Sequence, residues 1–579
     1  MTSTRRRGAF RRLSLGLGLL GAARLAAGAY ADDVGFTKLQ QELGAGTPTG
    51  AGVVVSQVEA AVTVKGQLTW YPDIGNVQFA GKTITDVSNA PDGIYSGHAT
   101  SVGTVFYGNT GSVAPAIDTI ASYYASTWLG GEFLWATGVQ RPDSSASRIV
   151  NHSWVGDGTT SNAEIHARVD WVVENDDQLH VTGMNNNIGA NTRPLMGNSY
   201  NVLAIGRSDG LHQTGSFAVD AVYTGTRAKP DLVVPAGSTS NAAPGASAIA
   251  ALLVQTGHGN PSLSVSPAYT NRAGLSIYNA ERTEVLRAAL MAGAERVTRN
   301  TSTANLGIYR DVAGNQTANG LDRRYGAGQV NAYNSYQMIA AGERNSSEDG
   351  GGSAGARGFD YDPAFGGSAG SNTTATYPLP AATGPQLLTA SLVWNLEIHG
   401  GTQNTFNATA TYRDLNLSLI DTANDNGVVA SSQSTIDGTE NLWLVVPAGA
   451  QYALRVSRAV ATNFNYDFAI AWQLLTDTDG DGAHDGQDNC IGRVNGPILR
   501  DRSGFSQRDS DNDGYGNVCD ADLDNNGTVN AADLNIFRAA FGSANAAADL
   551  DGSGFVNAAD LNIFRSLFGF APGPSAYAP

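Results

Sequence analysis

The segment KPDLVVPAGSTSNAAPGASAIAALL, residues 229–253, decides the fold of the N-terminal half of the chain. It begins with a short apolar strand at residues 232–234. A Gly-Ser-Thr-Ser turn follows, and the alanine-rich run at 242–253 is too apolar for a surface helix, so we expect a buried one. The sequence therefore predicts a strand–turn–helix unit with Ser240 at the start of its helix.

Ser240 is a candidate nucleophile. In the predicted turn its hydroxyl lies beside unpaired backbone N–H groups and the positive end of the helix dipole, and both stabilise an oxyanion. A serine at this place also caps a helix by accepting a hydrogen bond from the first turn, which is the structural alternative.

The same segment resembles the nucleophile segment of the subtilisin-like serine peptidases (subtilases), K-P-D-[IL]-x-A-P-G followed by G-T-S-M-A-x-P-H-V-A-G-x-A-A-L-L. The matching residues are Lys229, Pro230, Asp231, Pro235, Thr239, Ser240, Ala242, Pro244, Ala250, Ala251, Leu252 and Leu253. Ser238 replaces Gly, Asn241 replaces Met, and Gly245 replaces His. The resemblance implies that Ser240 is the catalytic nucleophile.

Residues 50–60, GAGVVVSQVEA, predict a buried strand that ends at Glu59. The subtilase pattern G-x-G-V-x-V-A-V-x-D-[TS]-G places the catalytic Asp at this position. The resemblance implies that Glu59 orients a catalytic imidazole, although Ala60 follows it instead of Thr or Ser. A solvated glutamate at a strand end is the alternative, and Asp86 and Asp92 are the other candidate acids.

Residues 96–108, SGHATSVGTVFYG, resemble the second subtilase motif, H-G-T-H-V-A-G-x-x-A-G. His98, Thr100 and Val102 match, whereas Ala99 and Ser101 depart from it. The first His of the motif is the general base, so the resemblance assigns that role to His98. The alternative is a structural histidine.

Residues 149–156, IVNHSWVG, resemble the strand I-N-x-S-x-G that lies along the substrate backbone in subtilases. A helix at 163–175 and a strand at 180–185 are expected next. The strand ends in VTGMN where the family has V-x-A-A-G-N, which implies that Asn185 is an oxyanion donor. Asn186 and Asn187 leave this register open by one residue.

Acid, base, asparagine and serine thus follow one another in the subtilase order. Strands and helices alternate between them, which predicts an α/β domain with a parallel sheet covered on both faces and the site at the carboxyl ends of the strands. We expect this peptidase domain to span residues 32–342, with helices at 283–292 and 325–340 closing it.

Residues 1–31 predict a signal peptide. Arginines at 5–7 and 11–12 precede an apolar run at 13–27, and Ala29-Tyr30-Ala31 is an A-x-A cleavage site. The sequence RRLSL at 11–15 also matches a twin-arginine signal weakly, so the export route stays open. No later run reaches the roughly 18 apolar residues of a membrane span. We therefore expect a secreted, extracellular or cell-surface protein.

The net charge of −17 is concentrated near the C-terminus, because residues 477–560 hold 16 Asp against 5 Arg. This acidity argues against a nucleic-acid partner.

The 579 residues are too many for one core, so several domains are expected. Residues 343–375 are rich in Gly and Ser and predict a linker. Alternating short runs at 376–475 predict an antiparallel β-sandwich with an accessory role, and 571–579 a tail.

Residues 476–520 contain carboxylates at every second position with glycine after the third, the arrangement that wraps oxygens around Ca²⁺. They resemble a thrombospondin type 3 repeat, and Cys490 and Cys519 fit one disulfide in an oxidising compartment. A solvated acidic linker is the alternative. The predicted calcium ligands here are Asp477, Asp479, Asp481, Asp485, Asp488, Asp509, Asp511, Asp513 and Asp520.

Residues 521–570 contain an internal repeat, since AADLNIFRAAFG at 531 recurs as AADLNIFRSLFG at 558. Each copy follows an oxygen-rich loop, and the pattern resembles a type I dockerin, which folds around two Ca²⁺ ions and docks onto a cohesin. The predicted ligands are Asp522, Asp524, Asn526, Asn530 and Asp533 in the first copy and Asp549, Asp551, Ser553, Asn557 and Asp560 in the second. A polar repeat without metal is the alternative.

The sequence as a whole predicts a secreted subtilisin-like serine endopeptidase with a Ser-His-Glu triad. Calcium-dependent C-terminal modules would attach it to a cohesin-type or cell-surface partner. The rival hypothesis is a catalytically inactive protein of the same fold that serves in calcium-dependent binding or adhesion.

Overall fold

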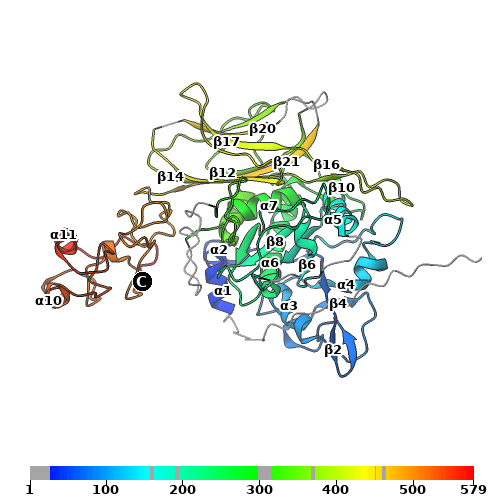
Figure 1. The fold of residues 1–579 in the computed structure, drawn as a ribbon, viewed down its shortest axis with the longest axis horizontal. Coiled ribbons are helices and arrows are strands. Elements are labelled where there is room, and N and C mark those ends of the chain that lie inside the picture. The colour runs from blue at the N-terminus through cyan, green and yellow to red at the C-terminus, as the bar shows by residue number, and fades with distance from the viewer. Residues whose placement is uncertain are drawn as a thin grey trace, which may run out of the picture.

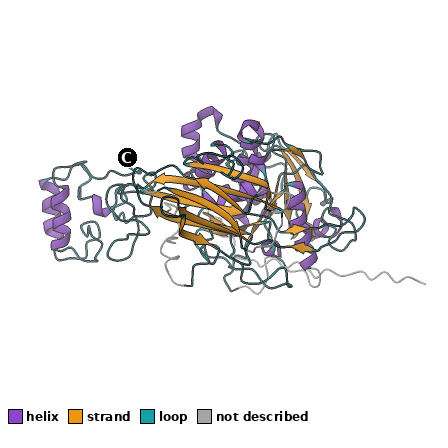
Figure 2. Cartoon of the chain, turned by 90° about the horizontal axis from the view of Figure 1, so that it is seen from above, coloured by secondary structure: helices purple, strands orange, loops and turns teal. Residues whose placement is uncertain are grey.

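The computed structural model describes residues 27–156, 162–189, 195–297, 314–366, 372–449, 451–459 and 465–578. Figure 1 shows three parts: an α/β domain, a β-sandwich that lies over it, and a loop-rich C-terminal part that carries helices α10 and α11. Seen from above in Figure 2, the C-terminal part again projects from one end of the other two.

The α/β domain is built on a seven-stranded sheet in which every pairing is parallel. In sheet order the strands are β4 (Thr83–Asp86), β5 (Thr119–Tyr124), β1 (Val55–Glu59), β6 (Ile149–His152), β7 (Leu179–Gly183), β8 (Leu203–Arg207) and β9 (Leu232–Val234). The predicted α/β fold class is confirmed.

Helices cover both faces of this sheet, as expected for a parallel sheet. Its helices are α1 (Ala27–Asp33), α2 (Phe36–Leu43), α3 (Gly97–Tyr107), α4 (Ala125–Thr127), α5 (Asn162–Asp176), α6 (Thr239–Gly259), α7 (Thr283–Ala292) and α9 (Ala332–Ala340). Helix α6 packs on one face with α3 and α9, and its alanine-rich body is buried against β6 to β9. Helix α5 and the turn η3 (Trp128–Glu132) form a second apolar cluster on the other face.

The N-terminal helix α1 overlaps the predicted signal peptide at residues 27–31. Its Tyr30 is buried in the main core. A Cβ atom placed on Gly245 of α6 would lie 2.4 Å from the Tyr30 hydroxyl oxygen. In the full chain, Tyr30 therefore fills the space that a larger side chain at position 245 would need.

The β-sandwich consists of two antiparallel four-stranded sheets. The first contains β12 (Arg357–Phe365), β21 (Tyr466–Thr476), β14 (Gln386–Val393) and β19 (Thr439–Val446); the second contains β13 (Thr374–Pro378), β20 (Tyr452–Arg458), β17 (Leu415–Asp421) and β18 (Gly427–Ser432). Paired short strands complete the two domains: β2 (Val62–Val64) with β3 (Gln67–Thr69), β10 (Tyr269–Thr270) with β11 (Ser276–Ile277), and β15 (Glu397–Ile398) with β16 (Ala410–Thr411).

The prediction of a linker over residues 343–375 is wrong for the middle of that segment, because residues 357–365 form β12, an edge strand of the first sheet. Its glycine-rich flanks gave the whole segment a linker-like composition, while the run RGFDYDPAF at 357–365 carries buried aromatic residues. The sandwich is therefore joined to the α/β domain by much less free chain than the composition indicates.

The first sheet of the sandwich is buried on both faces. Along β21, Ile470 and Trp472 point into the sandwich core, whereas Ala469 and Ala471 belong to the core of the α/β domain. Helix α7 packs on this second face, against β14 and β21. Small residues toward the helix and large ones toward the other sheet let the same strand serve two cores.

Buried hydrogen bonds reinforce this contact between the two domains. Asn201 donates to the carbonyl of Leu396 at 3.0 Å and accepts from its N–H at 2.7 Å. Arg287 of α7 donates to Asn395 Oδ1 at 3.0 Å, and Asn395 in turn donates to Glu284. The α/β domain and the sandwich thus form one continuous packed unit.

The C-terminal part has few regular elements besides α10 (Ala531–Ala540) and α11 (Ala558–Leu567), whose Phe537 and Phe564 meet in a small core. The predicted disulfide between Cys490 and Cys519 is present. The predicted tail is not free: the N–H of Ile491 donates to the carbonyl of Pro574 at 3.0 Å. Among the helices that the structure describes, none combines the length and hydropathy needed to cross a membrane.

Candidate active site and calcium loops

Glu59 and His98 form a hydrogen-bonded pair at the carboxyl edge of the parallel sheet. Glu59 is the last residue of β1, and His98 lies in the first turn of α3, whose N-cap is Ser96. The distance between Glu59 Oε2 and His98 Nδ1 is 2.8 Å. The glutamate is fully buried while the His98 side chain is 29% exposed, so the imidazole lies between a buried carboxylate and the surface.

The pKa of His98 lies above its ordinary value of 6.5. Burial of the ring acts to lower it, but the charge of Glu59 and the hydrogen bond to it together outweigh burial. A carboxylate at Nδ1 also holds the proton there in the neutral ring, which leaves Nε2 as the acceptor. This is the protonation pattern of a general base.

Because the base must be neutral, the raised pKa predicts that any reaction using His98 gains rate only as the pH rises through a value above 6.5. For the calcium-loaded protein, we expect the acid limb of the pH profile of kcat/KM for peptide hydrolysis to lie above pH 6.5. An acid limb well below pH 6.5 would show that Glu59 does not control the ionisation of His98.

Two further residues surround Glu59 and were missed by the sequence analysis. Gln57 Nε2 donates to Glu59 Oε1 at 3.0 Å, and the Tyr107 hydroxyl donates to Gln57 Oε1. The available signal was a glutamine two residues before Glu59, on the same face of a buried strand. Asp86, one alternative acid, accepts instead from the N–H groups of Ser88 and Ala90 in the turn after β4.

Ser240 is the second residue of α6, where the sequence predicts it. Ser238 is the N-cap and accepts from the N–H of Asn241, so the capping alternative for Ser240 is wrong. Ser153, just beyond β6, donates to the carbonyl of Ser240 at 3.0 Å. The helix start is thereby fixed against the end of the sheet.

The hydroxyl of Ser240 donates to the carbonyl of Ser153 over a long 3.4 Å. Among the described residues, no hydrogen bond joins Ser240 to His98. Hydrogen bonds between a nucleophile and its base are often long or unaligned in the absence of substrate. A rotation of the serine side chain away from Ser153 would release its hydroxyl for the base.

Asn185 lies two residues beyond the end of β7 and is buried. Its Oδ1 accepts from the N–H of Asn187 at 3.0 Å, and its Nδ2 is the donor of this side chain. Asn186 Oδ1 accepts from the N–H of Thr239 at 2.7 Å, which ties this turn to the start of α6. The turn after β7 and the residue before Ser240 therefore touch through Asn186, and the choice of Asn185 as the oxyanion donor stays a prediction.

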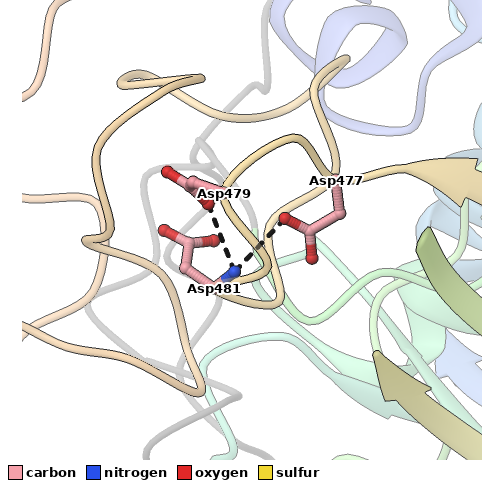
Figure 3. A group of neighbouring side chains, drawn as sticks. All are labelled: Asp477, Asp479 and Asp481. Atoms are coloured by element: carbon pink, nitrogen blue, oxygen red, sulfur yellow. Dashed lines mark hydrogen bonds between the residues drawn. The ribbon is translucent and has the colours of Figure 1, made fainter. Parts of the chain in front are cut away.

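Four acidic clusters lie in the C-terminal part, and each brings three carboxylates within 4.8 Å of one another. They are Asp477, Asp479 and Asp481; Asp509, Asp511 and Asp513; Asp522, Asp524 and Asp533; and Asp549, Asp551 and Asp560. Figure 3 shows the first, in which the N–H of Asp481 donates to both Asp477 and Asp479 at 3.2 Å.

The four loops share one backbone arrangement. The first Asp of each accepts from the N–H of the glycine five residues later, at 2.6 to 3.0 Å. These glycines are Gly482, Gly514, Gly527 and Gly554, with φ between 88° and 100°. Only glycine adopts such angles at low cost, and the turn gathers the carboxylates around one point.

The carboxylates in the first cluster are crowded. The pKa of Asp479 is raised to about 8 by burial and by the neighbouring charges of Asp481 and Asp488. Oxygen ligands packed in this way are what Ca²⁺ binds, so the donor set of each cluster fits that ion.

The other predicted ligands have different surroundings. Asn530 and Asn557 are the N-caps of α10 and α11, and each accepts from an N–H in its helix. Asp485 accepts from the backbone and hydroxyl of Thr478. The remaining predicted ligands outside the clusters are Asp488, Asp520, Asn526 and Ser553. As calcium ligands, these seven residues and the twelve in the clusters stay predictions.

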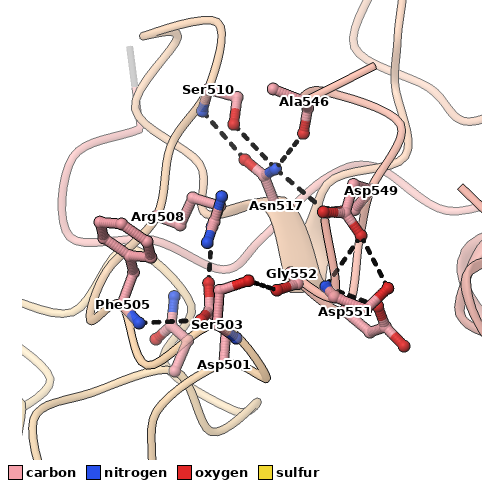
Figure 4. Close-up of polar contacts among 12 residues, drawn as sticks. Asp501, Ser503, Phe505, Arg508, Ser510, Asn517, Ala546, Asp549, Asp551 and Gly552 are labelled. Carbon is pink, nitrogen blue, oxygen red and sulfur yellow. Dashed lines mark hydrogen bonds and ion pairs between the residues drawn. The ribbon is translucent and has the colours of Figure 1, made fainter. Parts of the chain in front are cut away.

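The boundary predicted at residue 520 crosses a contact between the segment at 476–520 and the repeat at 521–570 (Figure 4). Ser503 donates to the carbonyl of Gly552, and Asn517 Nδ2 donates to that of Ala546 at 2.7 Å. Arg502 forms an ion pair with Asp551 at 3.0 Å. The segment before Cys519 thus packs on the last calcium loop.

Comparisons with known proteins agree with parts of this picture. Residues 508–534 match the family model of the thrombospondin type 3 repeat, over the second and third acidic loops. No curated protein matches the chain.

Solved structures also show likenesses. Proteases from Pseudoalteromonas arctica are 16% identical over 54% of this chain and 98% of theirs, with a TM-score of 0.32. Fervidolysin from Fervidobacterium pennivorans, described as a keratinolytic enzyme related to subtilisin, is 13% identical over 74% of this chain and 71% of its own, with a TM-score of 0.32. A type II cohesin–dockerin domain from Bacteroides cellolosolvens is 37% identical over 9% of this chain and 85% of its own, with a TM-score of 0.09. All three TM-scores lie below 0.5, and we draw nothing on function from them.

Proposed function

We propose that the protein is a secreted or cell-surface subtilisin-like serine endopeptidase that hydrolyses peptide bonds with a Ser240–His98–Glu59 triad. The observation that carries the proposal is the 2.8 Å contact between a fully buried carboxylate and the Nδ1 atom of a partly exposed histidine, at the sheet edge where α6 begins. A carboxylate at this place suits a general base, because it orients the imidazole and stabilises its cationic form.

In this mechanism the hydroxyl oxygen of Ser240 attacks the carbonyl carbon of the scissile peptide, and His98 Nε2 takes its proton. Glu59 keeps the imidazole oriented and stabilises its cationic form. The oxyanion accepts hydrogen bonds from Asn185 Nδ2 and from the N–H of Ser240, beside the positive end of α6. His98 then gives the proton to the leaving amine, and water releases the acyl group by the reverse steps.

Calcium is the proposed cofactor of the C-terminal part. The four carboxylate clusters named above would hold the ions, and bound Ca²⁺ would supply the positive charge that this crowded acidic region lacks. The repeated glycine turns pre-shape the loops, so the ions would stabilise the fold and take no part in the hydrolysis.

Removal of calcium is expected to unfold the C-terminal part before the rest of the molecule. A ligand at 100 times its Kd stabilises a folded state by about 2.7 kcal/mol per site. Calorimetry of the full chain with and without a chelator should show two effects. The chelator lowers the temperature of the first unfolding transition and leaves the temperature of the main transition unchanged. Asp509→Ala should shift the same transition, and Asp118→Ala in an exposed loop of the α/β domain should not. Identical calorimetric profiles for the wild type with and without chelator, for Asp509→Ala and for Asp118→Ala would contradict a structural role for calcium.

The C-terminal part would attach the enzyme to a cohesin-type or other cell-surface partner. Exposed apolar side chains there include Ile536, Phe541 and Phe568, from α10, α11 and the residues that follow them. The substrate would be a protein or peptide. The net charge of −17 of the chain argues against a nucleic-acid partner.

The competing function is a catalytically inactive subtilase-like protein that serves in calcium-dependent binding or adhesion. The contact of the Ser240 hydroxyl with Ser153 rather than His98 favours it. The two functions differ in one measurement, the hydrolysis of an unfolded protein substrate by calcium-loaded wild-type protein and by His98→Ala. Hydrolysis that is lost in His98→Ala supports the peptidase, and its absence in a folded wild-type protein supports the binding protein.

A further inference from the structure

Gln57 uses its whole side-chain amide in the space between β1 and α3. It is fully buried, and Nε2 donates to Glu59 Oε1 at 3.0 Å and to the carbonyl of Ala99 at 2.9 Å. The hydroxyl of Tyr107, at the end of α3, donates to Oε1. Both neighbours of Nε2 are pure acceptors when Glu59 is ionised, so the amide has only one satisfactory orientation.

The carboxylate of Glu59 relies on the hydrogen bond from Gln57, because it is buried and out of contact with water. Its side chain is fully buried, and a buried carboxylate is costly unless both oxygens find partners. Oε2 is taken by His98 and Oε1 by Gln57. Ala60, the next residue, has no polar side chain to offer.

The hydrogen bonds of Gln57 also join strand β1 to helix α3. Ala99 and Tyr107 lie in the first and last turns of α3, and His98 lies in the same helix next to Ala99. Gln57 therefore links the carboxylate on β1 to the helix that carries the imidazole. A fully buried glutamine whose Nε2 contacts a carboxylate and a backbone carbonyl is hard to explain by packing alone.

We propose that Gln57 is a positioning residue, which, held by Tyr107, fixes the rotamer of the Glu59 carboxylate and through it the orientation of the His98 imidazole. Its effect on hydrolysis rests on the proposed function. Its effect on the Glu59–His98 pair does not.

The test uses three full-length, calcium-loaded variants. Gln57→Met keeps the length of the side chain and removes the amide, and Tyr107→Phe removes only the hydroxyl that orients it. Ser56→Ala is the matched control, because it deletes another buried hydrogen bond of β1, to Ser147 at 2.7 Å, away from Glu59. Each is measured by thermal melting, by kcat and KM for a peptide substrate, and by NMR titration of the His98 ring.

For Gln57→Met we expect kcat to fall about 10- to 100-fold with little change in KM, the loss typical of one hydrogen bond to a charged group. The pKa of His98 should fall toward 6.5, because the carboxylate no longer stays aligned with Nδ1. Tyr107→Phe should show the same two changes to a smaller extent, and it carries the test should Gln57→Met fail to fold. Ser56→Ala should lower only the melting temperature.

The inference is overturned if kcat and the pKa of His98 in folded Gln57→Met or Tyr107→Phe equal those of the wild type or of Ser56→Ala. A wild-type protein without peptidase activity, in which the pKa of His98 still falls in Gln57→Met and to a smaller extent in Tyr107→Phe, would refute the proposed function and support the positioning role.

Discussion

Glu59→Gln is expected to lower kcat for peptide hydrolysis by about 10⁴-fold with little change in KM, the loss typical of an amide in place of a triad carboxylate. The amide is nearly isosteric, so the pocket between β1 and α3 stays filled. It carries no charge, however, and its NH₂ group competes to face His98 Nδ1, which favours the tautomer with the proton on Nε2. That tautomer cannot accept a proton from Ser240.

The matched control for this prediction is Glu281→Gln. Glu281 is also fully buried and also contacts a histidine, His258, at 3.0 Å, together with Arg148, but it lies outside the site. We expect this variant to melt at a lower temperature and to keep its kcat per folded molecule. A kcat for Glu59→Gln within tenfold of the wild type would contradict the role assigned to the carboxylate.

Ala471→Asp is expected to destabilise the α/β domain and the β-sandwich together, by more than about 4 kcal/mol. Ala471 is fully buried on β21, where it belongs to the core that α7 shares with the sandwich. A carboxylate there would be buried without a partner, and a buried unpaired charge is among the most costly substitutions. Both domains should therefore melt in one transition at a lower temperature.

Val428→Asp is the control for this substitution, because Val428 is 58% exposed on the edge strand β18. It should change the melting temperature little. Thermal unfolding is followed by near-ultraviolet circular dichroism, with limited proteolysis to identify which domain opens. Selective unfolding of the sandwich in Ala471→Asp, with the α/β domain intact, would mean that the two parts are tethered rather than packed as one unit.

The α/β domain was predictable from the sequence because its signals are local. The run at 242–253 is too apolar for a surface, and it forms the buried body of α6. The order of Glu59, His98, Asn185 and Ser240 along alternating strands and helices predicts one sheet edge, and the structure places all four at or just beyond that edge. The period of the calcium loops likewise predicts their shared glycine turn.

Long-range contacts were not predictable. The glycines around β12 dominate the composition of its segment and predict a linker, while its partner β21 lies about a hundred residues away in the chain. The hydrogen bond from Tyr107 to Gln57 joins residues 50 positions apart in the chain, and no local pattern encodes it.

The most direct test of the proposed peptidase is labelling of the calcium-loaded protein with a fluorophosphonate probe, followed by mass spectrometry to locate the label. Such a probe reacts with a serine only when a base activates it and an oxyanion site receives the phosphoryl oxygen. We predict a single label on Ser240 that is absent from Ser240→Ala and strongly reduced in His98→Ala. No label on a folded wild-type protein, or a label that persists in Ser240→Ala, would contradict it.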